Sequence, residues 1–278
     1  MSRVGGSSDP MTETGACNNF MKQLIKHFIL FFWSVMRYDD RPKILFYHDI
    51  GTKYTGMGTP SDVFWAHMKI LSESSCGFRH RVGLDDGFRG IWDHRERLKA
   101  LIVAGLRVDV SIAIDLIGLP QHLTWDEIRQ LESDYGVHFL CHTWSHQTLI
   151  GNMLWDRAKR EMDDDNHVTY QWYERELRAS RKEIERHLGH DVRELCLPVG
   201  YFNDEIIGLC HEAGYERIYS SIPGNIEGTS CLARWQGYVV PRCLCQFLSP
   251  REFNWVLNGG MLPLASRYFM MYYIKDPQ

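Results

Sequence analysis

The chain has 278 residues, of which 44% are apolar and 24% are charged. This length is enough to bury one large hydrophobic core, so a single catalytic domain is the economical prediction. The formal net charge of −4 leaves no surplus of Lys and Arg to neutralise a phosphate backbone, which argues against a nucleic-acid partner.

The first 40 residues are predicted to lie outside the catalytic domain. Residues 1–19 are rich in Gly, Ser, Thr and Asn, so we expect them to be disordered or vector-derived. Residues 20–40 are predicted to form an apolar helix, although the run 28–33 is far shorter than the roughly 20 residues that span a bilayer. Because a signal-peptide cleavage pattern is missing, we favour a cytoplasmic or peripheral-membrane location over secretion, with residues 20–36 packed on the domain or associated peripherally with a membrane.

From residue 43 onward, short β-prone runs alternate with helical patterns. The predicted strands lie at residues 43–47, 81–84, 108–114, 137–141, 192–197, 217–220 and 237–240. The predicted helices lie between Pro60 and Gly77, and at residues 92–104, 125–131, 170–188 and 203–213. Alternation of this kind indicates a parallel sheet.

This pattern predicts the class α/β and, within it, an irregular (β/α) barrel of about seven strands in a single domain at residues 41–278. A doubly wound open sheet is the alternative. In either fold the active site should lie beyond the carboxyl ends of the strands.

Polar side chains that can bind a metal follow three of the predicted strands. They are His48-Asp49, Asp85-Asp86-Gly87 and the segment from His142 to His146. Two imidazoles spaced i, i+4, together with one carboxylate, leave a coordination position open for water. We therefore predict a divalent metal, with Zn²⁺ as the default and Co²⁺ or Ni²⁺ as ions that also fit.

The adjacent aspartates suggest a division of labour. A metal needs only one of the two carboxylates, and the other can take the proton of the attacking water. An Asp-Asp-Gly triplet alone would indicate no more than a turn.

Together and in this order, these segments resemble the polysaccharide deacetylases, the carbohydrate esterase family 4 whose common domain is the NodB homology domain. The resemblance spans about residues 43–253. The segment 84–87 looks like the first family motif, and His142 to His146 matches the second, H-[ST]-x-x-H. The helix start at 123–128 is also similar to the one that usually precedes the second motif.

The resemblance implies roles for single residues. Asp85 would be the catalytic base, and Asp86, His142 and His146 would be the metal ligands. The segment 197–203 looks like the third motif in the form found in poly-N-acetylglucosamine deacetylases, and its backbone N–H groups, Val199 among them, would help hold the oxyanion. Tyr201 and Trp144 would suit stacking on a sugar ring.

The sequence departs from the family pattern at two points. No arginine precedes Pro198, where Cys196-Leu197 stand instead, so another group must orient Asp85, and Arg242 is the candidate. No histidine follows His211, so the late family histidine that serves as general acid has no counterpart. We expect His48 or a water to take its place, or Asp85 to return the proton that it removed.

The eight cysteines form no C-x-x-C pair, so we expect reduced, mostly buried thiols without a chemical role. Cys243 and Cys245 would share one face of a strand rather than surround a metal.

The predicted function is removal of an N-acetyl group from an amino sugar of a glycan or glycan precursor by metal-activated water. The motifs bind the carbonyl, so an O-acetyl esterase or a deformylase of the same fold remains an alternative. The two departures also keep open a catalytically impaired, glycan-binding relative.

Overall fold

The computed structural model describes residues 41–56, 58–75, 77–146, 170–200, 202–226, 232 and 235–259. The predicted segments at 1–19 and 20–40, and Tyr201, lie outside these residues, so their structure and the membrane association of residues 20–36 stay predictions. The domain boundaries at 41 and 278 likewise stay predictions. Within the described part of the chain, no helix is both long and apolar enough to cross a membrane.

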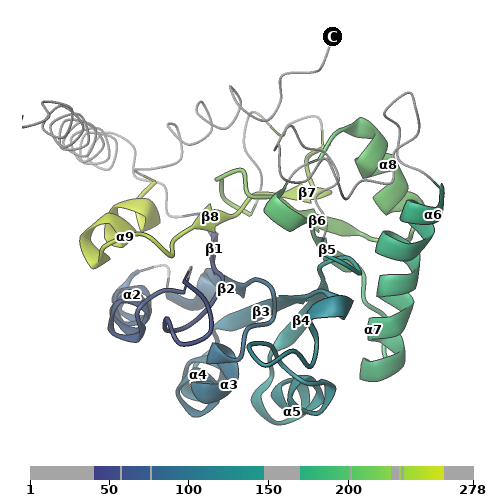
Figure 1. The fold of residues 1–278 in the computed structure, drawn as a ribbon. Helices are drawn as coiled ribbons and strands as arrows, with labels where there is room; N and C mark the ends of the chain where they lie inside the picture. The colour runs from purple at the N-terminus through teal and green to yellow at the C-terminus, as the bar shows by residue number, and fades with distance from the viewer. Residues whose placement is uncertain are drawn as a thin grey trace, which may run out of the picture.

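A curled parallel sheet forms the centre of the molecule (Figure 1). Its strands are β1 Ile44–Tyr47, β2 Arg81–Leu84, β3 Arg107–Ile112, β4 His138–Cys141, β5 Glu194–Cys196, β6 Arg217–Tyr219, β7 Val239–Val240 and β8 Cys243–Leu244. Their spatial order is β7-β6-β5-β4-β3-β2-β1-β8, and the pairings are parallel. This order never reverses, whereas a doubly wound sheet reverses at a switch point. The (β/α) barrel prediction is confirmed, and the open-sheet alternative is wrong.

The last two strands behave as one bent strand. Only Pro241 and Arg242 separate them; β7 pairs with β6, and β8 pairs with β1 on the other side. Pro241 has no N–H to offer a ladder, and the N–H of Arg242 donates to Ile222 O at 3.0 Å instead. The bend therefore completes an irregular ring of about seven strands. Strand β8 was not predicted from the sequence, because a strand of two residues is too short to show a periodic pattern.

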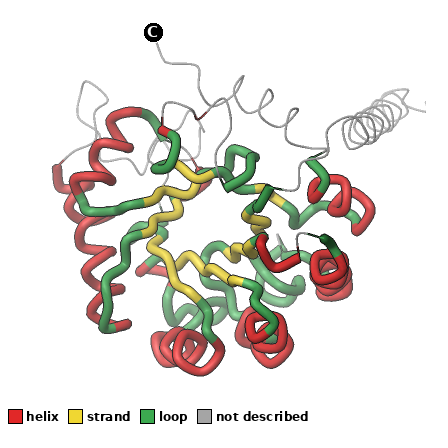
Figure 2. Tube along the Cα trace, turned by 180° about the vertical axis from the view of Figure 1, so that it is seen from behind, coloured by secondary structure: helices red, strands yellow, loops and turns green. Residues whose placement is uncertain are grey.

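Helices cover the outside of the sheet (Figure 2). They are α2 Ser61–Glu73, α3 Gly90–Asp93, α4 Arg95–Val103, α5 Trp125–Tyr135, α6 Tyr170–Tyr173, α7 Ser180–Leu188, α8 Asp204–Glu212 and α9 Pro250–Leu257. Short 3₁₀ turns lie at Gly77–Arg79, Ile114–Leu116 and Pro198–Gly200.

Two predicted helices differ in detail from the observed ones. The helix predicted at 170–188 is confirmed, but a π-helical stretch at Glu174–Ala179 joins α6 to α7. The last part of this helix, α7, ends at Gly189, whose φ of 80° is the left-handed conformation that glycine adopts without strain. The helix predicted at 92–104 is divided into α3 and α4 at His94.

Side chains alternate along each strand between the helix-covered face and the barrel interior. Leu45 and Tyr47 of β1 belong to the large outer core. Ile44 belongs instead to a small inner cluster, whose other buried members are Leu140, Cys196, Tyr219 and Val240. The same alternation directs the residues that follow β2 and β4, Asp85 and His142, toward the interior.

Candidate active site

Backbone hydrogen bonds to neighbouring strands anchor two of the predicted site residues, which directly follow β2 and β4. Asp85 N donates to Tyr47 O of β1 at 2.9 Å, and His142 N donates to Ile112 O of β3 at 2.9 Å. Both residues are buried at the carboxyl end of the barrel. They therefore lie directly after strand ends and are anchored to the neighbouring strands, where a barrel enzyme has its active site.

Three of the predicted ligand side chains converge. Asp86 Oδ1 lies 3.1 Å from His142 Nε2 and 2.9 Å from His146 Nε2. His142 Nδ1 donates to Cys196 O at 2.6 Å, which orients the ring and presents Nε2 toward Asp86. Asp86 Oδ1 is buried without a hydrogen bond of good geometry. A carboxylate oxygen and two imidazole nitrogens aimed at one point fit a divalent cation.

The charge of Asp86 suits this purpose. Burial alone would raise its pKa, but the contacts with His142 and His146 hold the pKa of this carboxyl well below its usual range. Asp86 is thus available as an ionised ligand at neutral pH.

A second group of possible ligands, Asp85, His142 and Cys196, also lies within 4.8 Å. Here the carboxylate is already engaged: Arg242 Nη1 and Nη2 donate to Asp85 Oδ1 and Oδ2 at 2.7 and 3.0 Å. Because a guanidinium holds both oxygens of Asp85, the group around Asp86 is the better metal site.

Arg242 lies against Asp85, as the sequence predicted. It stands at the bend between β7 and β8, its Nε donates to Ser220 O at 3.0 Å, and its guanidinium stacks 4.1 Å from the Phe46 ring. Ser111 Oγ adds a third hydrogen bond to Asp85, at 2.9 Å. Burial raises the pKa of Asp85, but Arg242, His142 and His48 together outweigh it, and the pKa lies below its ordinary value.

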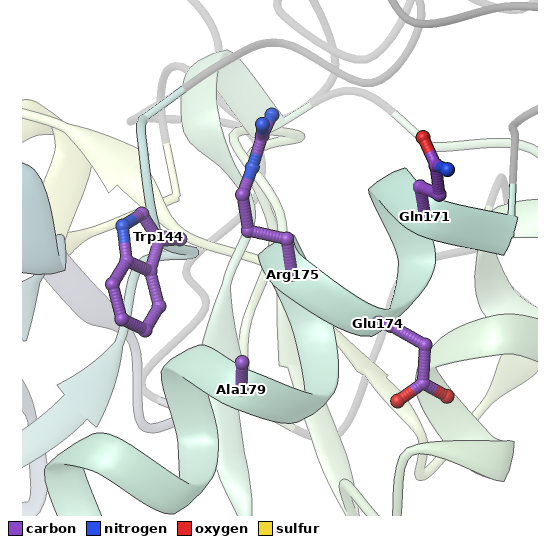
Figure 3. A pocket seen from close by; sticks show the side chains of 5 residues that line it. All are labelled: Trp144, Gln171, Glu174, Arg175 and Ala179. Carbon is purple, nitrogen blue, oxygen red and sulfur yellow. The ribbon is translucent and has the colours of Figure 1, made fainter.

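The other predicted site residues lie at different distances from the two aspartates and come from different segments. His48 follows β1 next to Asp85, is close enough to help lower the pKa of Asp85, and bonds Gln246 Oε1 through Nδ1. Val199 is 37% exposed at the end of β5. Trp144 borders a pocket of about 550 Å³ beside the π-helical stretch. The other residues that line this pocket are Gln171, Glu174, Arg175 and Ala179 (Figure 3). Tyr201 lies outside the described residues.

Backbone strain is concentrated at this end of the barrel. Among the described residues, those other than glycine with positive φ are Asp86, Thr143, His146 and Val199. All four belong to the three motif segments, and for β-branched Val199 a φ of 59° is a marked outlier. Strained conformations of this kind persist where the surrounding structure holds a functional geometry.

Sequence reasoning missed three residues of the site: Ser111, Cys196 and Glu176. The cysteines whose structure is described are buried and free, as expected. Cys196 nevertheless belongs to the site: its carbonyl oxygen accepts from His142 Nδ1, and its thiol lies 3.7 Å from Asp85 Oδ1. Strand alternation could have identified Ser111 as inward-facing. Glu176 lies 30 residues beyond the second motif and had no local signal.

Comparisons with known proteins agree with these observations. The family model described as polysaccharide deacetylase matches residues 103–218, which include the second and third motifs. The Bacillus subtilis (strain 168) protein YxkH, which is named a putative polysaccharide deacetylase, is 22% identical over an alignment of 200 residues that covers 65% of this chain. The chain spans 64% of the length of that relative.

Solved structures show the same fold. The polysaccharide deacetylase BC0361 from Bacillus cereus superimposes with a TM-score of 0.60 at 17% identity, over 78% of this chain and 69% of its own. IcaB from Ammonifex degensii superimposes with a TM-score of 0.58 at 13% identity, over 82% of this chain and 98% of its own. These structures show the fold, and the family-model match over residues 103–218 makes this part of the chain similar to the polysaccharide deacetylases, which share the NodB homology domain.

Proposed function

We propose that this protein is a metal-dependent hydrolase that removes the N-acetyl group from an amino sugar of a glycan or glycan precursor. The observation that carries the proposal is the juxtaposition of two differently held aspartates. Asp86 points at two histidine nitrogens, whereas Asp85, one residue earlier, is bound by Arg242. One carboxylate is therefore available to a metal and the other to a proton.

Asp86, His142 and His146 would hold the ion, with Zn²⁺ as the leading candidate and Co²⁺ or Ni²⁺ as others that suit the ligands. When bound, such an ion acts as a Lewis acid toward the acyl carbonyl and makes water a stronger nucleophile at neutral pH. Because the protein would supply only three ligands, a coordination position would remain for water or substrate.

Asp85 would act as the general base. Its lowered pKa keeps it ionised, and the bidentate Arg242 contact together with Ser111 Oγ fixes the plane of the carboxylate. A positioned base that accepts the proton of the attacking water contributes about 10²- to 10⁴-fold. Arg242 is a positioning residue in this scheme and would take the role of the arginine that the family motif has before the residue matching Pro198.

The leaving amine needs a proton. His48 lies beside Asp85 at the end of β1, and its Nδ1–H donates to Gln246 Oε1, so a doubly protonated His48 would donate from Nε2 and be left neutral. Asp85 could also pass on the proton that it has taken. Gly200 N–H already donates to Leu197 O at 2.8 Å, so Val199 N–H is the group of this turn that would stabilise the oxyanion. Trp144 would contact the sugar.

The test combines metal analysis of the purified protein with release of acetate from N-acetylated amino-sugar oligomers. We expect close to one bound divalent ion per chain and acetate release that a chelator abolishes. An O-acetylated xylan and an N-formylated amino sugar in the same panel separate the esterase and deformylase alternatives. A fully metal-loaded protein that releases no acid from any substrate would instead be an impaired glycan-binding relative.

A further inference from the structure

The two predicted histidine ligands are supported very unequally by their own surroundings. His142 is 1% exposed, and both its backbone N–H and its Nδ1 are hydrogen-bonded to the sheet. The side chain of His146 is 32% exposed and lies at the far end of the loop, with a left-handed φ of 57°. Something other than the sheet must hold His146 in place.

That support comes from Glu176 in the π-helical stretch. The residue is fully buried, and its Oε2 accepts hydrogen bonds from Trp144 N at 3.0 Å and Ser145 N at 2.8 Å. Its Oε1 accepts from Ser145 Oγ and from Arg175 Nε, both at 2.8 Å. One carboxylate therefore binds two of the three residues that separate His142 from His146.

The helix is locally adapted to deliver this side chain. Ser180 N–H donates to Arg175 O, one residue further back than in an α-helix, and Ser180 Oγ donates to the carbonyl group of Glu176. Such π-helical insertions occur mostly as single turns inside α-helices and are frequent at functional sites. The stretch also lies next to Trp144, as Figure 3 shows for Arg175 and Ala179.

The loop would relax without this contact. Thr143 and His146, on either side of the bonded peptide groups, both have a φ that L-residues adopt only under constraint. We propose that Glu176 is the positioning residue for His146. By binding Trp144 N and Ser145 N, it keeps His146 Nε2 close enough to Asp86 Oδ1 and His142 Nε2 for the three atoms to share one metal ion. This inference rests on the proposed metal site.

The test measures metal affinity in Glu176→Ala and Glu176→Gln, using competition with a chelator for Zn²⁺ and the visible absorption bands of the Co²⁺ form. Loss of an outer-shell partner typically weakens metal binding about 10- to 100-fold, and we expect this for Glu176→Ala. Glu176→Gln keeps an acceptor oxygen for the backbone N–H groups, so its loss should be smaller. Ser145→Ala, which removes one of the four hydrogen bonds, should have the smallest effect.

Glu183→Ala is the matched control, because Glu183 lies on α7 and pairs with Arg186 at the surface. It should bind metal as the unmodified protein does. A folded Glu176→Ala with unchanged Zn²⁺ affinity and Co²⁺ spectrum overturns the proposal, even if the metal-free protein melts earlier. If circular dichroism shows that Glu176→Ala does not fold, Glu176→Gln decides: weaker binding supports the proposal, and unchanged binding overturns it. An unmodified protein that binds no divalent ion would refute the proposed function instead.

Discussion

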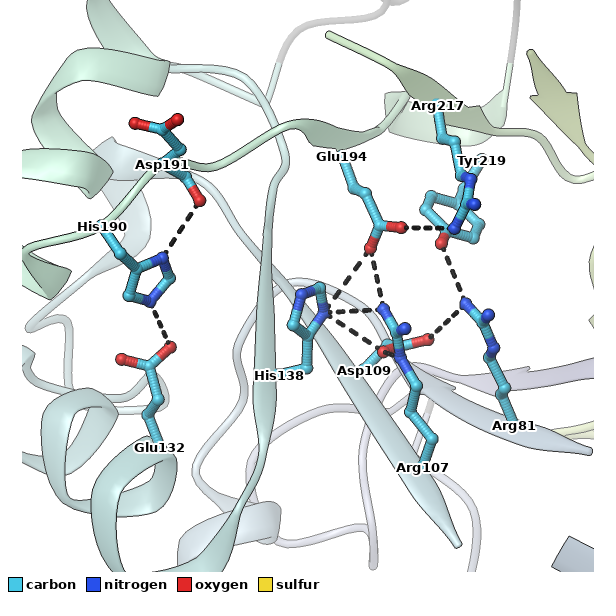
Figure 4. A network of polar contacts seen from close by, with 10 residues as sticks. All are labelled: Arg81, Arg107, Asp109, Glu132, His138, His190, Asp191, Glu194, Arg217 and Tyr219. Carbon is cyan, nitrogen blue, oxygen red and sulfur yellow. Dashed lines mark hydrogen bonds and ion pairs between the residues drawn. The ribbon is translucent and has the colours of Figure 1, made fainter. Parts of the chain in front are cut away.

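At the amino end of the barrel, charged side chains from β3, β5 and β6 neutralise one another (Figure 4). Arg107 lies 2.6 Å from Asp109 and 2.9 Å from Glu194, and Glu194 also pairs with Arg217 at 3.2 Å. Arg81 of β2 extends the network to Tyr219 with a hydrogen bond of 3.3 Å. Each charge has an opposite charge beside it, and the described residues of these strands have ordinary backbone angles.

The carboxyl end uses the same kinds of residue in a different way. Asp85 is matched by Arg242, but Asp86 faces two histidines and has an oxygen without a well-formed hydrogen bond. Among the described residues, the left-handed ones other than glycine lie at this end. An oxygen of Asp109 at the amino end is also buried without a hydrogen bond, but there the carboxylate is paired with Arg107 at 2.6 Å. The amino end is thus an ion-pair network that stabilises the barrel, whereas the carboxyl end has strained residues around a carboxylate that faces only histidines, as expected where a ligand is to be bound.

The largest expected effect separates the two aspartates of the carboxyl end. Asp85→Asn keeps the size of the side chain but removes the base, so turnover should fall by about 10²- to 10⁴-fold while the metal content persists. Asp86→Asn should lose the metal as well. Metal stoichiometry and acetate release, with folding checked by circular dichroism, distinguish the two variants. Full activity in Asp85→Asn would refute the mechanism.

The next effect compares the same substitution at both ends. Lys cannot bind both oxygens of Asp85 and Ser220 O as Arg242 does, so Arg242→Lys should reduce activity about 10- to 100-fold. The pKa of Asp85 should rise as its partner weakens, and the acid limb of the activity profile should move to higher pH. Arg217→Lys is the control at the amino end and should keep its rate and its profile. Equal losses in both variants would contradict the contrast between the ends.

Breaking the amino-end network should affect stability rather than catalysis. Asp109→Asn leaves Arg107 poorly compensated, and we expect a loss of about 2–4 kcal/mol in the free energy of unfolding, because Arg107 is 36% exposed and the pair is only partly desolvated. Burial raises the pKa of Asp109, but His138 and Arg107 lower it below its ordinary value.

The pH dependence of this loss follows from that shift. A carboxyl whose pKa is depressed in the folded state contributes stability above its unfolded pKa, and this contribution disappears as the pH falls through the folded pKa. Denaturant titrations at neutral pH and at progressively lower pH should therefore show the difference between Asp109→Asn and the unmodified protein shrinking below about pH 4. The rate per folded molecule should not change.

The smallest expected effect concerns Asp49, at the carboxyl end beside His48. Burial raises its pKa from 3.8 to about 7, and its Oδ2 is buried without a hydrogen bond. A raised carboxyl pKa means that stability is lost as the pH climbs from about 4 to about 7, since the fold favours the neutral form. Asp49→Asn should thus gain in melting temperature relative to the unmodified protein at pH 8 but not at pH 4. Asp191→Asn, at an exposed position before β5, should show no such gain.

The sequence by itself determined the order of the elements and the chemistry of the motifs. Period-2 runs such as 81–84 and the repeated helical patterns are local signals, and they predicted the barrel and the strand ends that carry Asp85, Asp86, His142 and His146. The capping box at Thr124 and Glu127 likewise forms as its residue types indicate. Motif residues are recognisable because their types and spacing are short-range properties of the chain.

Only the tertiary structure decided which residues support those motifs. The contact between Asp85 and Arg242 joins positions 157 residues apart, and it depends on a bend at Pro241-Arg242 that closes the barrel against β1. Glu176 meets the histidine loop through a π-helical irregularity, which has no short-range signature. These contacts arise where distant strands and helices are brought together, so local residue patterns do not encode them in a readable form.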